Sequence, residues 1–220
     1  MAFWSYNDSQ AQNNAVEIYN QLSSYGFGYN AICGVLGNIG HESGYNPWKW
    51  QVYTGTTADI LSTNDTYLIT HRTGHAYGLF QHDPASDYIY SPIAQAQANY
   101  GPNFSNRQGN QLDGSAQLYN LEYYCIPTLG AWIPTTAYPL SYAQFKSSTQ
   151  SADYLALAWL YEYERGTYSQ ARVTNAVWWY NNLSSLIGPT PPTPPTPPTP
   201  PTPAGTFGKM KFIYYLKRKW

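Results

Sequence analysis

Apolar residues recur three or four positions apart along much of the chain as far as residue 184, which is the spacing that places side chains on one face of a helix. The pattern predicts helices over five segments, residues 11–24, 31–43, 113–125, 151–165 and about 170–184. Capping residues support these boundaries, with N-caps expected at Asn30, at Asp113 or Ser115 and at Ser151, and stops at Gly44 and Gly166. Residues 67–81 differ, because β-prone residues flank a Thr-Gly turn there and predict a short hairpin. The expected fold class is mainly α, a helical domain with a small β-hairpin.

A segment made only of proline and threonine, residues 189–203, divides the chain. Proline lacks the amide donor that helices and sheet interiors need, so this segment is predicted to form an extended linker of roughly 45 Å. Before it, residues 1–188 are expected to form one domain, and they carry 12 acidic and six basic residues, a net charge of −6. After it, residues 204–220 carry five basic residues and no acidic one, interspersed with apolar side chains. Such a tail suits an anionic membrane surface or an anionic polymer, and the alternative is a passive extension.

Aromatic residues make up 17% of the chain, whereas charged residues make up only 10%. Two interpretations are open, a large aromatic core or aromatic side chains that stack on neutral polar faces such as sugar rings. Cys33 and Cys125 lie on apolar faces and lack metal-ligand spacing, so we expect buried free thiols. The N-terminal residues lack the basic and apolar regions of a signal peptide, and no apolar run is long enough to span a bilayer.

The predicted helix over residues 31–43 carries glycines among its apolar residues and a carboxylate near its end. One step beyond Ile39, the apolar stripe of this helix reaches Glu42, which directs that side chain toward the interior. Partial burial and the negative end of the helix dipole both favour a protonated carboxyl there, as a general acid requires. Each glycine costs roughly 1 kcal/mol relative to alanine, and we expect the glycines to permit close approach of neighbouring helices. The alternative is a solvated glutamate at a frayed helix end.

Three stretches together resemble the phage tail lysozyme family, within the wider lysozyme and lytic transglycosylase superfamily: GNIGHESGYNP (37–47), AYGLFQ (76–81) and WLYEYERG (159–166). The resemblance spans roughly residues 10–185 and implies an α+β, lysozyme-like fold with the hairpin beside the cleft. The chain departs from the family pattern at His82, where the family usually has Trp, and at Gly166, where it usually has Pro. These differences affect the expected shape of one cleft wall and leave the acidic residue in place.

The resemblance also implies an activity and roles for individual residues. Glu42 corresponds to the catalytic acid of the family, and four residues are expected to bind substrate, Ser43, Tyr77, Gln81 and Tyr163. The implied activity is that of a muramidase, which hydrolyses bacterial peptidoglycan between N-acetylmuramic acid and N-acetylglucosamine. Such chemistry needs an acid to protonate the leaving oxygen, and neither a cofactor nor a metal is expected.

The second group that hydrolysis requires is left open by the sequence. Asp65 and Asp83 are the preferred candidates for a second carboxylate, with Asp59 and Glu164 as further ones. A lytic transglycosylase would cleave the same bond without a second carboxylate, because the 6-hydroxyl of the sugar attacks the anomeric carbon.

Two further classes of function remain as alternatives. Four histidines lie within 42 residues, His41, His71, His75 and His82. A zinc-dependent wall hydrolase would use such ligands, although the expected turn between the second and third of them argues against a zinc site. A non-enzymatic wall-binding tail protein would also suit the aromatic composition and the linker.

The predicted setting is a phage tail, or release from the host cytoplasm at lysis, with action on the bacterial cell wall. The expected partner is peptidoglycan, together with an anionic membrane or wall polymer for residues 204–220. No nucleic-acid partner is expected.

Deleting residues 204–220 is expected to leave cleavage of soluble wall fragments nearly unchanged, because a stiff linker separates them from the domain. Binding to anionic vesicles is expected to fall, most strongly at low salt, because the five cations act through screened electrostatics. Co-sedimentation of full-length and truncated protein over a salt series measures the change, with neutral vesicles as the control. Equal sedimentation at every salt concentration would make the tail a passive extension.

Overall fold

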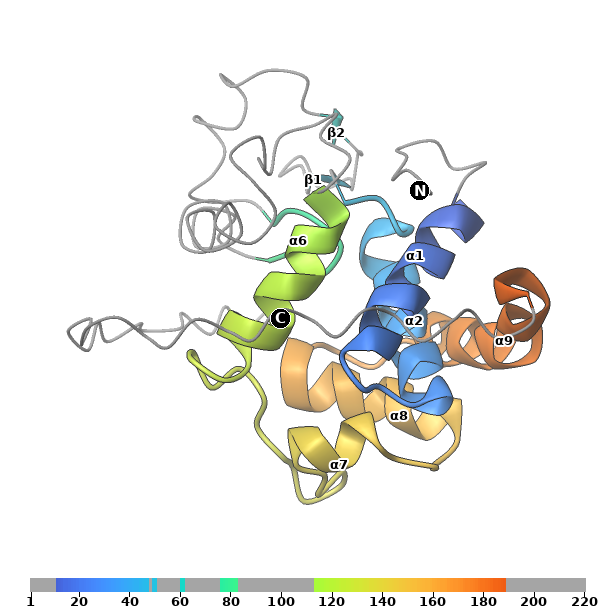
Figure 1. The fold of residues 1–220 in the computed structure, drawn as a ribbon. Helices are drawn as coiled ribbons and strands as arrows, with labels where there is room; N and C mark the ends of the chain where they lie inside the picture. The colour runs from blue at the N-terminus through green and yellow to red at the C-terminus, as the bar shows by residue number, and fades with distance from the viewer. Residues whose placement is uncertain (1–10, 48, 51–59, 62–75, 83–112, 189–220) are drawn as a thin grey trace.

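The computed structural model describes residues 11–47, 49–50, 60–61, 76–82 and 113–188, which form a helical body (Figure 1). In chain order the elements are α1 (Ala11–Ser24), α2 (Tyr29–Ser43), β1 (Lys49–Trp50), β2 (Ile60–Leu61), α6 (Asp113–Asn120), η2 (Leu121–Cys125), α7 (Tyr142–Lys146), α8 (Ala152–Trp159), η3 (Leu160–Glu164) and α9 (Gln170–Ile187). The predicted linker and tail, residues 189–203 and 204–220, lie outside the described residues.

Each of the five predicted helical segments is helical in the structure. The segments over 113–125 and 151–165 both end in a π-helical turn, η2 and η3, which their apolar spacing did not distinguish from α-helix. The helix α7 is not among the predicted ones, because five residues are too few to show a periodicity. Its start is fixed by a capping box, in which the Ser141 hydroxyl accepts from the Gln144 N–H and the Gln144 side chain accepts from the Ser141 N–H.

Three of the predicted helix caps are wrong. The helix α6 begins at Asp113, so neither Asp113 nor Ser115 is its N-cap. The N-cap of α2 is Gly28 rather than Asn30, whose side-chain amide instead donates to the backbone carbonyls of Thr149 and Gln150. The residue that ends η3 is Arg165, in the left-handed conformation at φ 52°, rather than Gly166. The predicted stop at Gly44 is confirmed, because this residue is left-handed at φ 60° and its N–H donates to the Gly40 carbonyl.

The predicted hairpin over residues 67–81 is not shown, since residues 67–75 lie outside the described residues. Residues 76–82 form a tight loop, closed by two 3.0 Å backbone hydrogen bonds between Tyr77 and His82. The β1–β2 pair is antiparallel and two residues long, with Lys49 opposite Leu61. The described fold is therefore mainly α, with very little β-structure.

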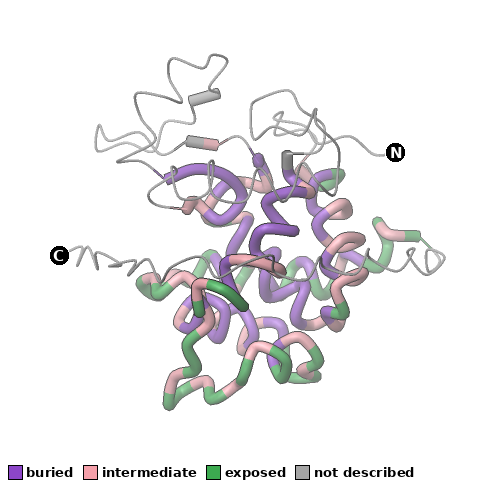
Figure 2. Tube along the Cα trace, turned by 60° about the vertical axis from the view of Figure 1, so that its left-hand side comes forward, coloured by how far each residue is buried: buried purple, intermediate pink, exposed green. Residues whose placement is uncertain are grey.

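The helix α2 lies at the centre of the body and packs against α1, α8 and α9 (Figure 1). All of its residues from Ala31 to Ile39 are buried, and buried positions gather at the centre of the body (Figure 2). A Cβ on Gly34 would lie 2.8 Å from the backbone of Leu155 in α8, and one on Gly37 would lie 2.5 Å from the backbone oxygen of Arg172 in α9. The expected close approach of helices is confirmed at Gly34 and Gly37.

Much of the aromatic content packs inside the domain. Trp159 is fully buried, and its ring centroid lies 4.6–5.9 Å from those of Tyr163, Phe145, Phe80 and Trp132. Rings from the 76–82 loop, the segment before α7, α7 itself and η3 therefore meet around one side chain of α8. Such tilted ring contacts stabilise a core beyond the area that they bury.

Cys33 and Cys125 are both free and buried, as predicted. Burial raises the pKa of each thiol to about 12, so both remain protonated at neutral pH. Within the described ranges, no helix combines the length and the apolar character needed to cross a membrane.

Replacing Gly37 by alanine is expected to destabilise the domain by about 1–3 kcal/mol, because the new methyl group overlaps the α9 backbone. Gly28→Ala is the matched control, since a Cβ there would meet the Lys146 carbonyl at an ordinary 3.4 Å. Urea unfolding of both variants measures the difference. If Gly37→Ala were at least as stable as the parent, the close approach of α2 to α9 would be wrong.

Candidate active site

The three stretches that carry the family resemblance lie together in the structure. The first and second are joined through Gln117 of α6, whose side chain donates to the Pro47 carbonyl and accepts from the Leu79 N–H. The second and third are joined by Phe80, whose ring contacts the ring of Tyr163 at 5.9 Å between centroids. Segments distant in sequence are thus held side by side by one buried amide and one aromatic contact.

Each stretch contains a residue other than glycine with a positive φ, and they are Tyr45, Gln81 and Arg165, at φ 66°, 49° and 52°. No other non-glycine residue in the described ranges has a positive φ. Residues with a side chain adopt this left-handed conformation at a cost, and such strain concentrates at functional sites. The backbone geometry therefore indicates a functional site at these stretches, independently of the family resemblance.

Glu42 lies in the last turn of α2 and turns toward α9, as its place on the apolar stripe predicts. One carboxylate oxygen accepts a short hydrogen bond from Nη2 of Arg172, in the first turn of α9. The Glu42 side chain is 23% exposed, whereas that of Arg172 is only 7% exposed. Glu42 is thus anchored on its inner side and open to solvent on the other.

Glu164, at the end of η3, is the second carboxylate on Arg172. Its Oε2 lies 2.5 Å from Nη1 of Arg172, and its Oε1 accepts a 3.1 Å hydrogen bond from the Trp159 indole N–H. Burial, and after it the negative charge of Glu42, raise the pKa of Glu164 to about 8, against the opposing effect of Arg172. The Glu164 side chain is only 8% exposed, so its carboxyl contacts Arg172 and has little contact with solvent.

Asn38 holds the guanidinium from the α2 side. Its Oδ1 accepts a 2.9 Å hydrogen bond from Nη1 of Arg172, and its amide nitrogen donates to the carbonyls of Gly34 and Ala156. Because this side chain is fully buried and bonded to both α2 and α8, it fixes the guanidinium between the two carboxylates.

The other predicted site residues occupy different environments. Ser43 is buried and its hydroxyl donates to the Ile39 carbonyl within α2, and Tyr77 is 1% exposed in the core. The Gln81 side-chain amide nitrogen donates to the carbonyls of Lys49 and Gly78 and so holds the 76–82 loop. The Tyr163 hydroxyl lies 3.3 Å from Nε2 of His82. Their predicted role in substrate binding stays a prediction, and these contacts give each a structural role as well.

The remaining candidates lie outside the described residues. They are Asp59, Asp65 and Asp83 as second carboxylates, and His71 and His75 as zinc ligands. Where the structure does describe the chain, no cluster of three or more potential metal ligands occurs.

Arg172 and Asn38 are not among the residues that the sequence predicts for the site. The sequence nevertheless indicates that Arg172 is buried. It is the one charged residue of α9, and it lies on the buried stripe of this helix with Ala176, Trp179 and Leu183. A single charge on an apolar stripe indicates a buried partner. The sequence does not indicate which acidic residue that partner is.

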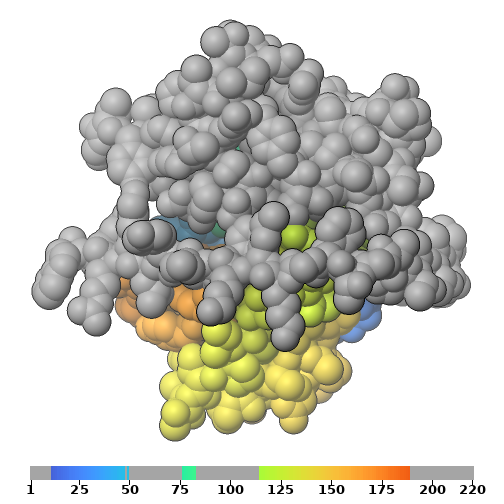
Figure 3. Space-filling view, turned by 90° about the vertical axis from the view of Figure 1, so that its left-hand side faces the viewer, coloured from blue at the N-terminus to red at the C-terminus, as the bar shows by residue number. Residues whose placement is uncertain are grey.

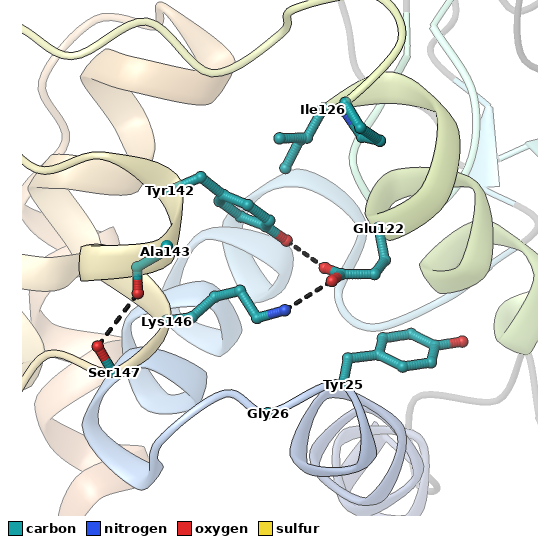
Figure 4. A pocket seen from close by; sticks show the side chains of 9 residues that line it. Tyr25, Gly26, Glu122, Ile126, Tyr142, Ala143, Lys146 and Ser147 are labelled. Atoms are coloured by element: carbon teal, nitrogen blue, oxygen red, sulfur yellow. Dashed lines mark hydrogen bonds and ion pairs between the residues drawn. The ribbon is translucent and has the colours of Figure 1, made fainter. Parts of the chain in front are cut away.

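A separate pocket of about 630 Å³ opens between the end of α1, η2 and α7 (Figure 4). Its wall includes Glu122. The Oε1 atom of Glu122 lies 2.6 Å from Nζ of Lys146, and its Oε2 accepts a 2.6 Å hydrogen bond from the Tyr142 hydroxyl. None of the predicted site residues lines it. Residues of α7 and of the segment before it, yellow-green to yellow, form the lower surface in Figure 3.

Comparison with known proteins agrees with the resemblance. The sequence pattern of the family described as phage tail lysozyme matches residues 13–183, which include all three stretches. The chain is also similar to "Morphogenesis protein 1" of Bacillus phage B103, with 30% identity over 173 residues. The similar region is 78% of this chain and 39% of that relative, so it spans about two fifths of the relative's length.

The stability of the domain is expected to depend on pH through Glu164. A carboxyl whose pKa rises from 4.5 to about 8 on folding stabilises the fold most at low pH, and this contribution is lost as the pH rises through that range. The free energy of unfolding of the parent should therefore fall relative to that of Glu164→Gln between about pH 5 and pH 8.

Urea unfolding of both proteins at several pH values measures this difference. Comparing the two cancels most of the contribution of other groups, such as His82, whose pKa burial lowers to about 4. A difference that stays constant across the range would show that Glu164 has no raised pKa.

Proposed function

The chain belongs to the phage tail lysozyme family, and we propose that it is a muramidase with Glu42 as its general acid. The substrate is the glycan strand of bacterial peptidoglycan, and the bond cleaved lies between N-acetylmuramic acid and N-acetylglucosamine. This function rests on the family, on the convergence of the three stretches, and on the position of Glu42 among them.

The observation that carries the proposal is the orientation of Glu42. Among the three charged side chains that meet here, Glu42 is the most exposed, at 23% against 8% for Glu164 and 7% for Arg172. A general acid must reach the substrate oxygen while its surroundings hold it in position. Glu42 meets both requirements, because the end of α2 presents it and Arg172 restrains it.

In the proposed reaction, the Glu42 carboxyl gives its proton to the glycosidic oxygen as the bond to the anomeric carbon breaks. Positive charge develops on the sugar ring, and a carboxylate or an activated water completes hydrolysis. Asp65 and Asp83 remain the candidates for this second role. Transfer to the 6-hydroxyl of the same sugar, as in a lytic transglycosylase, is the alternative outcome.

The proposed setting is a bacteriophage. The family is described as phage tail lysozyme, and the relative in Bacillus phage B103 carries the name of a morphogenesis protein. Both descriptions favour a protein that acts on the cell wall as part of the virion over one released only at lysis. The relative is longer than this chain, so its further parts do not bear on the proposal.

Replacing Glu42 by glutamine is expected to reduce the clearing of purified peptidoglycan by at least about a hundredfold, because the amide keeps the shape but cannot donate the proton. Glu17→Gln in α1 is the matched control, since it makes the same change away from the cluster. Turbidity loss measures the rate, and circular dichroism verifies the fold of both variants. Clearing by Glu42→Gln at the parental rate would remove Glu42 from the mechanism.

Mass spectrometry of the digested fragments distinguishes the two reactions. A muramidase leaves reducing N-acetylmuramic acid ends, which are the expected products. Anhydro ends would assign the protein to the transglycosylases while leaving the role of Glu42 as the acid intact.

A further inference from the structure

The proposed role of Glu42 raises a question of charge. A general acid must carry a proton, whereas an ion pair with Arg172 is a contact of the ionised carboxylate. Giving Glu42 a proton would leave a buried guanidinium without its anionic partner, which is costly unless another anion is in contact with it. Glu164 is that anion, because it contacts the other terminal nitrogen of the same guanidinium.

We propose that Glu164 is a positioning residue that enables Glu42 to act as the acid, by serving as the counter-ion of Arg172 whenever Glu42 is protonated. The inference rests on the proposed function and extends it. The two carboxyls hold one proton between them, and Arg172 contacts both, so the cluster stays neutral whichever carboxyl carries the proton. When Glu42 has passed its proton to the leaving oxygen, its new negative charge is stabilised by Arg172.

The geometry places Arg172 where it needs an anionic partner at all times, and gives it two carboxyls in contact. It lies in the first turn of α9, where the helix dipole disfavours a cation, and its Nε is buried with no hydrogen-bond partner in the described part of the chain. Its two terminal nitrogens each contact one carboxylate, with Asn38 as a third acceptor. A guanidinium suits this bridging position, because its planar donors point in several fixed directions.

The surroundings of Glu164 favour one shared proton. Burial and the charge of Glu42 raise the pKa of Glu164 to about 8, so the two carboxyls do not both ionise near neutral pH. Among the described residues, two other titratable groups lie close by, namely His41 beside Glu42 on α2 and Lys49 of β1, whose charge acts on His41. Partial burial, and after it the positive charge of Arg172, lower the pKa of His41.

The test is the pH dependence of kcat/KM for Glu164→Gln. In this variant, Glu42 is the only anionic partner of Arg172 left in the described part of the chain. Arg172 should then favour the ionised form of Glu42, so the alkaline limb of the profile should move to lower pH by about one unit or more. Activity should therefore be lost near neutral pH and recovered in acid. A merely structural role would lower the rate at every pH without moving the limb.

Glu162→Gln is the matched control, because it makes the same change in the same π-helical turn. Glu162 is fully buried and accepts a hydrogen bond from the Thr135 N–H rather than from Arg172. Its variant should keep the parental limb. Arg172→Gln should move the limb upward, because it removes the cation and leaves two facing carboxyls. An unmoved limb in Glu164→Gln, or the same shift in both glutamate variants, would overturn the inference.

A second measurement needs neither activity nor a stable variant. In protein with ¹³C-labelled glutamate side chains, the Glu42 and Glu164 carboxyl signals should show the same two titration steps, because each senses the proton of the other. Two independent single steps would overturn the inference even if Glu164→Gln failed to fold. Failure of the proposed function appears elsewhere, as activity retained in Glu42→Gln, so the two failures are distinguishable.

Discussion

The contact of the α2 backbone with α8 and α9 sets the position of every group around Glu42. A side chain on Gly34 or Gly37 would overlap the neighbouring backbones, so only glycine allows the helices to lie at this distance. The backbone oxygen that faces Gly37 belongs to Arg172, the residue whose guanidinium contacts Glu42. Helix approach and ion pair are therefore two consequences of one packing arrangement. The helix propensity lost at the glycines is offset by the interactions that this approach allows.

The ion pair shows how a charged cluster is accommodated in an apolar body. Burying three charged side chains is favourable only when each finds hydrogen-bond partners. The π-helical turn η3 contributes to this, because it presents Glu162 to the Thr135 N–H and Glu164 to Trp159 and Arg172. Insertions of this kind into helices are frequent at functional sites. In this domain the turn carries one of the two carboxylates of the cluster.

The strained residues connect the packing to the proposed chemistry. Each of them lies at or just after a segment of the site: Tyr45 two residues after α2, Gln81 in the 76–82 loop and Arg165 directly after η3. The left-handed backbone changes the direction of the chain at each point. Around them, hydrogen bonds and ring contacts hold the backbone, such as the Tyr45 hydroxyl that accepts from the Trp179 indole at 2.5 Å. Such a framework suits a site in which one carboxyl must keep its orientation through proton transfer.

The sequence by itself determined the local features of this protein. Apolar spacing located the five helical segments, Gly44 located the end of α2, and the stripe through Ile39 gave the direction of Glu42. These features depend on residues within one or two turns of each other, which is the range over which periodicity and capping act. The N-cap predicted at Asn30 was wrong, because that side chain found partners in another segment.

Only the tertiary structure decided which faces meet. Arg172 lies 130 positions from Glu42, and Gln117 lies 70 positions from Pro47, yet both contacts hold the site together. Periodicity shows that a side chain faces the interior but does not show what it faces there. The partner of Glu42, and the role of Glu164 beside it, follow from how α2, α9 and η3 pack, because the ion pairs form only once the helices are in contact.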